Sequence, residues 1–162
     1  MPIASGPRPE KLSEKAVCRM RSIIAELVRS IAPYDAIEQE HRAATLAWIA
    51  SGAPLCRIEK PATPPQHLVS YFILYDAGRQ QVLLVDHRKA GLWLPSGGHV
   101  EPGEHPRTTV IREAREELQI AARFMVPQPL FLTVTQTVGS IARHTDISLV
   151  SIRKWGGVDN ET

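Results

Sequence analysis

Three glutamates in the middle of the chain have the types and spacing that best suggest chemistry. Glu113, Glu116 and Glu117 stand at positions i, i+3 and i+4, which on a helix gathers them in an arc about 100° wide. Close carboxylates repel one another unless a cation compensates them, so the cluster predicts a bound positive charge. Oxygen ligands without a neighbouring His/Cys pattern favour Mg²⁺, or Mn²⁺, over Zn²⁺. Because Mg²⁺ commonly shares its coordination with substrate phosphates, the pattern indicates a phosphate-containing substrate.

The cluster alone has a simpler explanation, since charged residues usually form a solvated helix face. Here, however, it belongs to a longer pattern of fixed spacing, made of Gly98, Glu104, Arg112, Glu113, Glu116, Glu117 and Ile120. This segment resembles the Nudix box, G-x5-E-x7-R-E-U-x-E-E-x-G-U, where U is a bulky aliphatic residue. A chance match of the first six positions is on the order of one in a hundred thousand. Two positions depart from the box, Ala114 and Gln119, and Gln119 should either strain the turn after the helix or end it differently.

The resemblance implies a role for each charged residue of the box. Glu116 and Glu117 would be metal ligands, and Glu113 would be a ligand or the base that orients water. Arg112 would pair with a box carboxylate and orient it, while Glu104 would anchor the preceding loop to the helix. In this family the metals neutralise charge on the pyrophosphate oxygens and activate water, the two requirements of the hydrolysis.

The glycine-rich segment before the helix is expected to be a loop over residues 96–103 that binds phosphate. By resemblance, the backbone of Gly97 and Gly98 leaves room for phosphate, and Gly98 supplies a carbonyl ligand for the metal. His99 is a candidate phosphate contact, although a loop histidine is more often structural. Trp93 stands beside strand residues and is expected in the core, with stacking on a base as the alternative.

Other charged residues are weaker candidates. Scattered surface charge is the expected role of Arg88, Lys89, Arg143 and His144, with steering of an anionic substrate as the alternative. Some relatives of the Nudix family place a further acidic catalytic residue after the box, and the weak candidates for it here are Asp146, Asp159 and Glu161.

The elements that position the box follow from hydrophobic periodicity. Apolar residues at three- and four-residue intervals predict a helical hairpin, and Pro106 is expected at the start of a third helix. Alternating and branched runs predict strands, the first two of them joined as a β-hairpin. The expected helices are 11–31, 35–50 and 106–118, and the expected strands are 68–75, 81–86, 93–95, 130–138 and 147–152.

These elements predict an α/β (α+β) protein, and the resemblance, over roughly residues 68–152, implies an α/β/α sandwich with a mixed sheet. We expect a flexible lead-in (1–10), an N-terminal helical extension (11–52), a proline-rich connector (53–66) and a Nudix hydrolase domain (67–162). The stretch 154–162 shows no helical periodicity, so the C-terminal part is expected to be shortened relative to the family. An apolar sheet face would then need cover from the N-terminal helices or from a second chain.

Composition narrows the class of protein. At 162 residues and 43% hydrophobic content, the chain is long enough for one catalytic domain with an extension. A net charge of +2 disfavours a dedicated nucleic-acid binder. Cys18 and Cys56 lack metal-ligand spacing and are expected to be reduced thiols. Neither a secretory signal nor an apolar run of roughly 20 residues is found, so we expect a cytoplasmic protein without a membrane span.

Together, these features predict a Mg²⁺-dependent hydrolase that cleaves the pyrophosphate bond of a nucleoside diphosphate linked to another group. The alternative is a shortened Nudix-fold module, catalytically weak or inactive, that binds a nucleotide or a partner without turnover. A regulator that uses the domain as a ligand sensor has less support, because no DNA-reading motif occurs. The expected partner is a nucleotide-type small molecule, with a homodimer as one way to cover the open sheet face.

Overall fold

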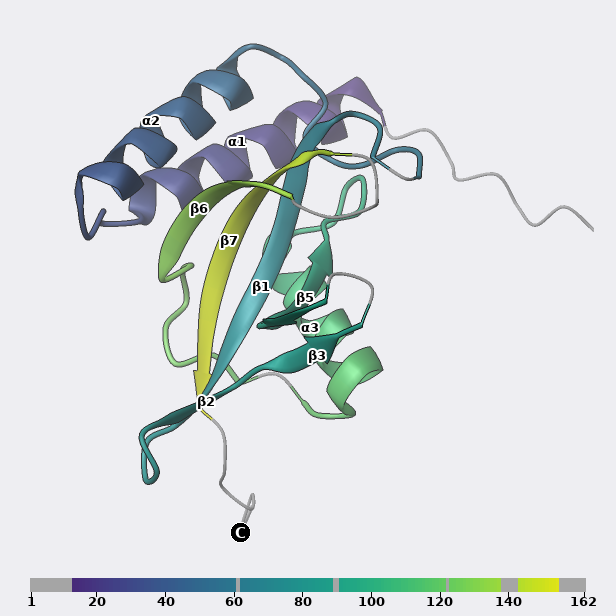
Figure 1. Cartoon of the computed structure of the whole chain (residues 1–162). Helices are drawn as coiled ribbons and strands as arrows, with labels where there is room; N and C mark the ends of the chain where they lie inside the picture. The colour runs from purple at the N-terminus through teal and green to yellow at the C-terminus, as the bar shows by residue number, and fades with distance from the viewer. Residues whose placement is uncertain (1–12, 61, 89–90, 122, 138–142, 155–162) are drawn as a thin grey trace, which may run out of the picture.

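The computed structural model describes residues 13–60, 62–88, 91–121, 123–137 and 143–154 (Figure 1). The described chain has a mixed α+β fold, as predicted. Its elements, in chain order, are α1 (Glu14–Ser30), α2 (Ala36–Ala50), β1 (Gln66–Asp76), β2 (Gln81–Leu83), β3 (Val85–His87), β4 (Leu92–Leu94), β5 (Ser96–His99), α3 (Pro106–Leu118), β6 (Phe131–Gln136) and β7 (Thr145–Lys154).

The main sheet is mixed and is built around the long strand β1. Its order is β2-β1-β7-β6, and β5 also pairs with β1. β1 and β7 run parallel over ten residue pairs, from Gln66–Thr145 to Tyr75–Lys154, whereas the other pairs in this sheet are antiparallel. β3 and β4 form a separate antiparallel hairpin. Sequence patterns located β1 and β7 but did not reveal their parallel pairing, which joins segments about half the chain apart.

Three expectations were wrong, two about strands and one about burial. The stretch 81–86 was expected to be one strand, but the strand breaks at Leu84, so that β2 pairs with β1 and β3 pairs with β4. Residues 96–99 were expected to be loop but form β5, because the glycines allow close approach to β1. Trp93 was expected in the core, yet it is 66% exposed on β4.

The helical hairpin forms as predicted and shares a core with the sheet. α1 is capped by the Ser13 side chain, which accepts from the Ala16 N–H, and α2 is capped by Asp35, which accepts from the Glu38 N–H. Residues buried together from both helices, the connector and the sheet are Ile24, Ala25, Val28, Ile31, Ile49, Leu55, Leu68, Val100, Leu132, Ile147 and Leu149. The N-terminal helices therefore cover an apolar part of the sheet.

α2 also protects the edge strand β6. One carboxylate oxygen of Glu38 accepts from the Leu132 N–H at 3.0 Å, and the other accepts from the Tyr34 N–H at 2.7 Å. His41 accepts from the Val134 N–H at 3.3 Å. Unpaired N–H groups at a sheet edge invite pairing with another chain, so these side chains block that contact. Of the two expected ways to cover the apolar sheet face, cover by the N-terminal helices is the one that the described residues show.

α1 and α3 lie over the same face of β1. Side chains alternate along a strand, so Leu68, Phe72 and Leu74 share a face. Leu68 packs in the cluster with α1, whereas Phe72 and Leu74 are buried with Val110 and Ala114 of α3. The hairpin thus covers one end of this face and α3 covers the other, while His67 and Val69 point to the opposite face.

α3 begins at Pro106, as predicted, and ends in a left-handed residue. Gln119 has φ 56° and ψ 34°, and its N–H donates to the Arg115 carbonyl at 3.1 Å. This is the strained turn that the departure from the box predicted, because a left-handed conformation costs an L-residue roughly 1–2 kcal/mol.

Within the described residues, no helix has the length and apolar character needed to cross a bilayer.

Replacing Gln119 by glycine should therefore raise the free energy of unfolding by about 0.5–1 kcal/mol, the relieved strain less the greater entropy of the unfolded chain. Urea unfolding measures the difference. Gln39→Gly is the matched control, since Gln39 is an exposed residue inside α2 and its replacement should cost about 1 kcal/mol. Equal destabilisation by the two changes would contradict the strain.

Candidate functional site

Arg112 holds the box together. Its Nε lies 3.1 Å from Glu104 Oε1, and its Nη2 lies 3.1 Å from Glu104 Oε2, so the pair is bidentate. Nη1 donates to Glu113 Oε1 at 2.6 Å and Nη2 also donates to the His99 carbonyl at 3.3 Å. The hydrogen bond to Glu104 raises the pKa of Arg112 further above its usual range, burial opposes this rise, and the bond to Glu113 adds to it. Arg112 thus links β5, the loop that follows it and α3.

Glu104 ties the loop to the helix. Its Oε2 accepts from the Thr109 hydroxyl at 2.8 Å and from the Glu101 N–H at 3.2 Å, in addition to its bonds with Arg112. Burial alone would raise the pKa of Glu104, yet the hydrogen bonds from Arg112, Thr109 and Glu101 outweigh it and hold that pKa below the usual value. The carboxylate therefore stays ionised. This is the arrangement expected of a loop anchor.

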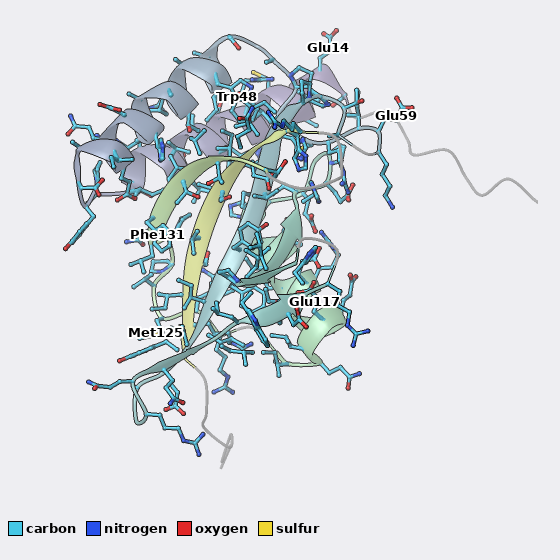
Figure 2. All side chains as sticks on the ribbon, viewed as in Figure 1. Glu14, Trp48, Glu59, Glu117, Met125 and Phe131 are labelled. Carbon is cyan, nitrogen blue, oxygen red and sulfur yellow. The ribbon has the colours of Figure 1, made fainter. Side chains whose placement is uncertain are left out.

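The other three glutamates differ in their surroundings. Glu117 accepts a short hydrogen bond from the Ser96 hydroxyl of β5, and Figure 2 shows Glu117 beside this strand. Glu113 is mostly buried, whereas the Glu116 side chain is 59% exposed and lies 3.7 Å from Arg112 Nη1. Burial raises the pKa of Glu113, Arg112 opposes this rise, and the charges of Glu117 and Glu116 add to it. The negative charges of Glu117 and Glu116 therefore act on Glu113.

The two glycines explain how α3 can approach β5 so closely. A Cβ added at Gly98 would overlap the Glu113 carboxylate. At Gly97, where φ is +153°, a Cβ would overlap the Ser70 carbonyl and Tyr71 of β1. Gly98 is therefore required for contact with the helix, and Gly97 for contact with the sheet.

Gly98→Ala should lower kcat for nucleotide hydrolysis by about 10- to 100-fold, since the methyl group displaces the Glu113 carboxylate and a misplacement of about 1 Å can have this effect. Steady-state kinetics with saturating divalent cation measure it. Gly78→Ala is the control, because a Cβ there meets only Asp76 Oδ1, at 3.4 Å. Unchanged kcat in Gly98→Ala would show that this contact does not matter for turnover.

The box offers carboxylate oxygens, which are the ligands that a hard divalent cation prefers. The Glu113 carboxylate lies directly against the backbone of Gly98, and Glu116 and Glu117 follow on the same helix. Among the described residues, however, a tighter group is found elsewhere: ligand atoms of His67, His99, His144 and Asp146 lie within 4.8 Å of one another. The three glutamates do not form such a group while Arg112 and Ser96 hold two of them.

His99 lies at the edge of the box, but its side chain turns away from it. Its carbonyl meets Arg112, whereas its ring lies 4.9 Å from that of His67, measured between centroids. A phosphate contact by His99 therefore stays a prediction. His144 was expected to be surface charge, which was wrong, since its side chain is only 14% exposed. Asp159 and Glu161, the other acidic candidates, and Lys89 lie outside the described residues.

The histidine cluster was missed because its members are far apart in the sequence. A partial sequence signal existed, since His67 and Asp146 directly precede the expected strands 68–75 and 147–152. Only the pairing of β1 with β5 and β7 brings them together with His99.

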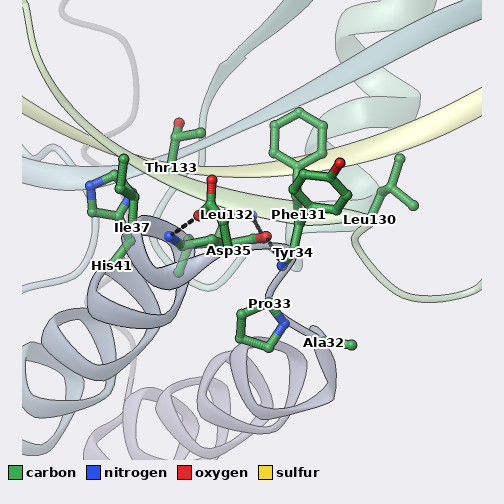
Figure 3. A pocket seen from close by; sticks show the side chains of 11 residues that line it. Ala32, Pro33, Tyr34, Asp35, Ile37, His41, Leu130, Phe131, Leu132 and Thr133 are labelled. Atoms are coloured by element: carbon green, nitrogen blue, oxygen red, sulfur yellow. Dashed lines mark hydrogen bonds between the residues drawn. The ribbon is translucent and has the colours of Figure 1, made fainter.

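A separate pocket of about 750 Å³ lies between the α1–α2 turn and β6 (Figure 3). Its lining includes Tyr34, Ile37 and Phe131, together with the Glu38 and His41 side chains that protect β6. These residues are outside the box, so this pocket is not part of the carboxylate site.

The fold and site thus define a mixed α+β protein with a carboxylate-bearing helix against a glycine-containing strand. A family model described as NUDIX domain matches residues 65–158, and the chain belongs to this family. It is 37% identical over 67 residues to the CTP pyrophosphohydrolase of Escherichia coli (strain K12), a match that covers 41% of this chain and 42% of that protein. The chain therefore matches less than half the length of this curated relative.

The structure also resembles a solved one, the crystal structure of a NUDIX family hydrolase from Clostridium perfringens. The two chains are 24% identical, with a TM-score of 0.44. The match covers 55% of this chain and 69% of the other.

Proposed function

We propose that this protein is a divalent-cation-dependent hydrolase that cleaves the pyrophosphate bond of a nucleoside diphosphate linked to another group. The observation that carries this proposal is the contact of Glu113 with Gly98, held by Arg112. It gives the box a defined geometry, in which the Glu113 carboxylate lies against the glycine backbone. Family membership and the similarity to a CTP pyrophosphohydrolase support the proposal.

In this proposal, Glu113, Glu116, Glu117 and the Gly98 carbonyl hold the cation, with Mg²⁺ as the physiological ion and Mn²⁺ able to replace it. When bound, the cation neutralises phosphate charge and lowers the pKa of water. Arg112 keeps Glu113 oriented and ionised through its 2.6 Å hydrogen bond. Glu104 fixes Arg112, so the loop and the helix approach the substrate as one unit.

Glu113 has a second candidate role in the reaction. Its burial raises its pKa, which makes it a better proton acceptor than an exposed glutamate. It is therefore the candidate base that takes a proton from the attacking water, if Glu116 and Glu117 hold the cation. The cytoplasmic location and a homodimer stay predictions.

The test is to incubate the purified chain with a panel of nucleoside triphosphates, including CTP, and nucleoside diphosphate conjugates. Each reaction is run with Mg²⁺, with Mn²⁺ and with excess chelator, and phosphate is measured after treatment with inorganic pyrophosphatase or phosphatase. We expect release from at least one substrate that requires the cation. Release that is equal with chelator and with Mg²⁺ would contradict the proposal. Cation-dependent nucleotide binding without release would favour the binding module instead.

A further inference from the structure

A buried cluster of three histidines and one aspartate lies on the face of β1 opposite to the box. His67 and Asp146 are register partners on β1 and β7, and His99 of β5 is the partner of Val69. His67, Val69 and their partners therefore share one face. Gly98, one residue before His99, faces Glu113 and hence the other face. The cluster is thus separated from the carboxylate site by the thickness of the sheet.

Several polar atoms of this cluster are buried without a hydrogen-bond partner. His67 is fully buried, and the atoms concerned are His67 Nε2, His99 Nε2 and Asp146 Oδ1. Two Nε2 atoms lie close to Asp146 Oδ1, that of His67 at 3.5 Å and that of His144 at 3.4 Å, but neither approach has hydrogen-bond geometry. A buried polar atom without a partner loses its hydration without compensation, so several together call for a ligand.

The outer nitrogens of two rings are oriented as they are in metal-binding histidines. His67 Nδ1 lies 2.9 Å from the Pro64 carbonyl, so this nitrogen carries the hydrogen and leaves the Nε2 lone pair directed into the cluster. The Thr137 hydroxyl donates to the His144 carbonyl, which leaves its oxygen to accept from His144 Nδ1 at 3.1 Å. The tautomer of each ring is therefore inferred from its neighbour: Nδ1 carries the hydrogen in both, and both Nε2 atoms lie within 3.5 Å of Asp146 Oδ1.

The spacing of these atoms is near that of a tetrahedral site. Bonds of 2.0–2.1 Å from Zn²⁺ to nitrogen or oxygen place the ligand atoms about 3.3 Å apart. The distances from Asp146 Oδ1 to His144 Nε2 and His67 Nε2, 3.4 and 3.5 Å, are already close to this ligand–ligand distance. All four ligand atoms lie within 4.8 Å of one another. Small side-chain rotations bring the set to tetrahedral geometry.

The electrostatics favour unprotonated histidines. Burial lowers the pKa of His67, and burial together with the charge of Arg57 lowers the pKa of His99 to about 3. Histidine must be neutral to bind a metal, and the buried Nε2 atoms of His67 and His99 that lack a hydrogen-bond partner are the geometric evidence for a ligand here. Arg57 and Lys60 add positive charge near the cluster, which opposes a cation, while the Asp146 carboxylate compensates one charge of a divalent ion.

We propose that His67, His99, His144 and Asp146 bind a transition-metal ion, for which Zn²⁺ is the best fit. Three imidazole nitrogens with one carboxylate oxygen suit Zn²⁺ and not Mg²⁺. The ion joins β1, β5 and the start of β7, and it fixes the end of β5 beside Gly98. It is a structural site, chemically distinct from the carboxylate site across the sheet.

The test is Zn²⁺ binding to the full chain after treatment with chelator, measured by competition with a chromogenic chelator. Glu117→Gln removes a ligand candidate of the other site, and His87→Ala removes an exposed histidine on β3. We expect one equivalent of Zn²⁺ in the native chain and in both of these controls. His144→Ala and Asp146→Asn should each weaken binding by at least about 100-fold.

Two further measurements keep the proposal testable if a variant fails to fold. Co²⁺ bound to the native chain should give the intense visible absorption of a tetrahedral site, and Zn²⁺ should raise the melting temperature of the native chain but not of Asp146→Asn. Weak octahedral Co²⁺ absorption would overturn the site. So would loss of Zn²⁺ binding in Glu117→Gln with retention in His144→Ala.

Discussion

Glu117→Gln should lower kcat/KM for nucleotide hydrolysis by about 100- to 1000-fold. Loss of one charged group that stabilises the transition state typically has an effect of this size. Glutamine matches the size of glutamate, and its amide oxygen can still accept from the Ser96 hydroxyl. The fold should therefore remain intact, and the melting temperature without metal should change little. Steady-state kinetics over a range of Mg²⁺ concentrations measure the effect.

Glu14→Gln is the matched control for this prediction, because Glu14 is exposed in the first turn of α1, away from α3 (Figure 2). It should leave kcat/KM unchanged. A further comparison separates ligand from base: if Glu117 holds the cation, raising Mg²⁺ should partly restore activity in Glu117→Gln. Full activity of this variant at low Mg²⁺ would contradict a role for Glu117 in the reaction.

The box could be predicted from the sequence because its residues are close along the chain. A helix places residues 113, 116 and 117 on one face by its period alone, and the Arg112–Glu104 pair spans only eight positions. The structure adds contacts that the spacing of the residues does not reveal. Gly98 is required because Glu113 packs against its backbone, and Ser96 is a partner of Glu117 that no motif position indicated.

The rest depends on contacts between distant segments. Alternation predicts that β1 and β7 are strands, but it does not state which strands pair or in which direction. The histidine cluster arises only from that pairing, as does the protection of β6 by Glu38, which joins residues 94 positions apart. Two consecutive glycines favour a loop, so the sequence predicts a loop where β5 lies. In the structure these glycines permit close packing.

The second prediction with a large expected effect concerns the N-terminal helices. Val28 is fully buried in α1, in the core cluster that contains Leu68 and Val100. Val28→Asp places a carboxylate in this apolar cluster without a partner, which costs several kcal/mol. Since a domain of this size is stable by only about 5–15 kcal/mol, the variant should be largely unfolded or lose at least about 4 kcal/mol in urea unfolding.

Val17→Asp makes the same chemical change in the same helix, at a residue that is 44% exposed and lies near the positive end of α1. It should alter the free energy of unfolding by less than about 0.5 kcal/mol. The comparison also tests how the hairpin relates to the site. Val100 follows His99 directly, and its N–H donates to the Leu68 carbonyl at 3.1 Å, so the core beneath α1 supports the strand that carries Gly98. If Val28→Asp unfolded α1 alone and left hydrolysis intact, the helices would be an independent extension; loss of both together would make them part of the catalytic domain.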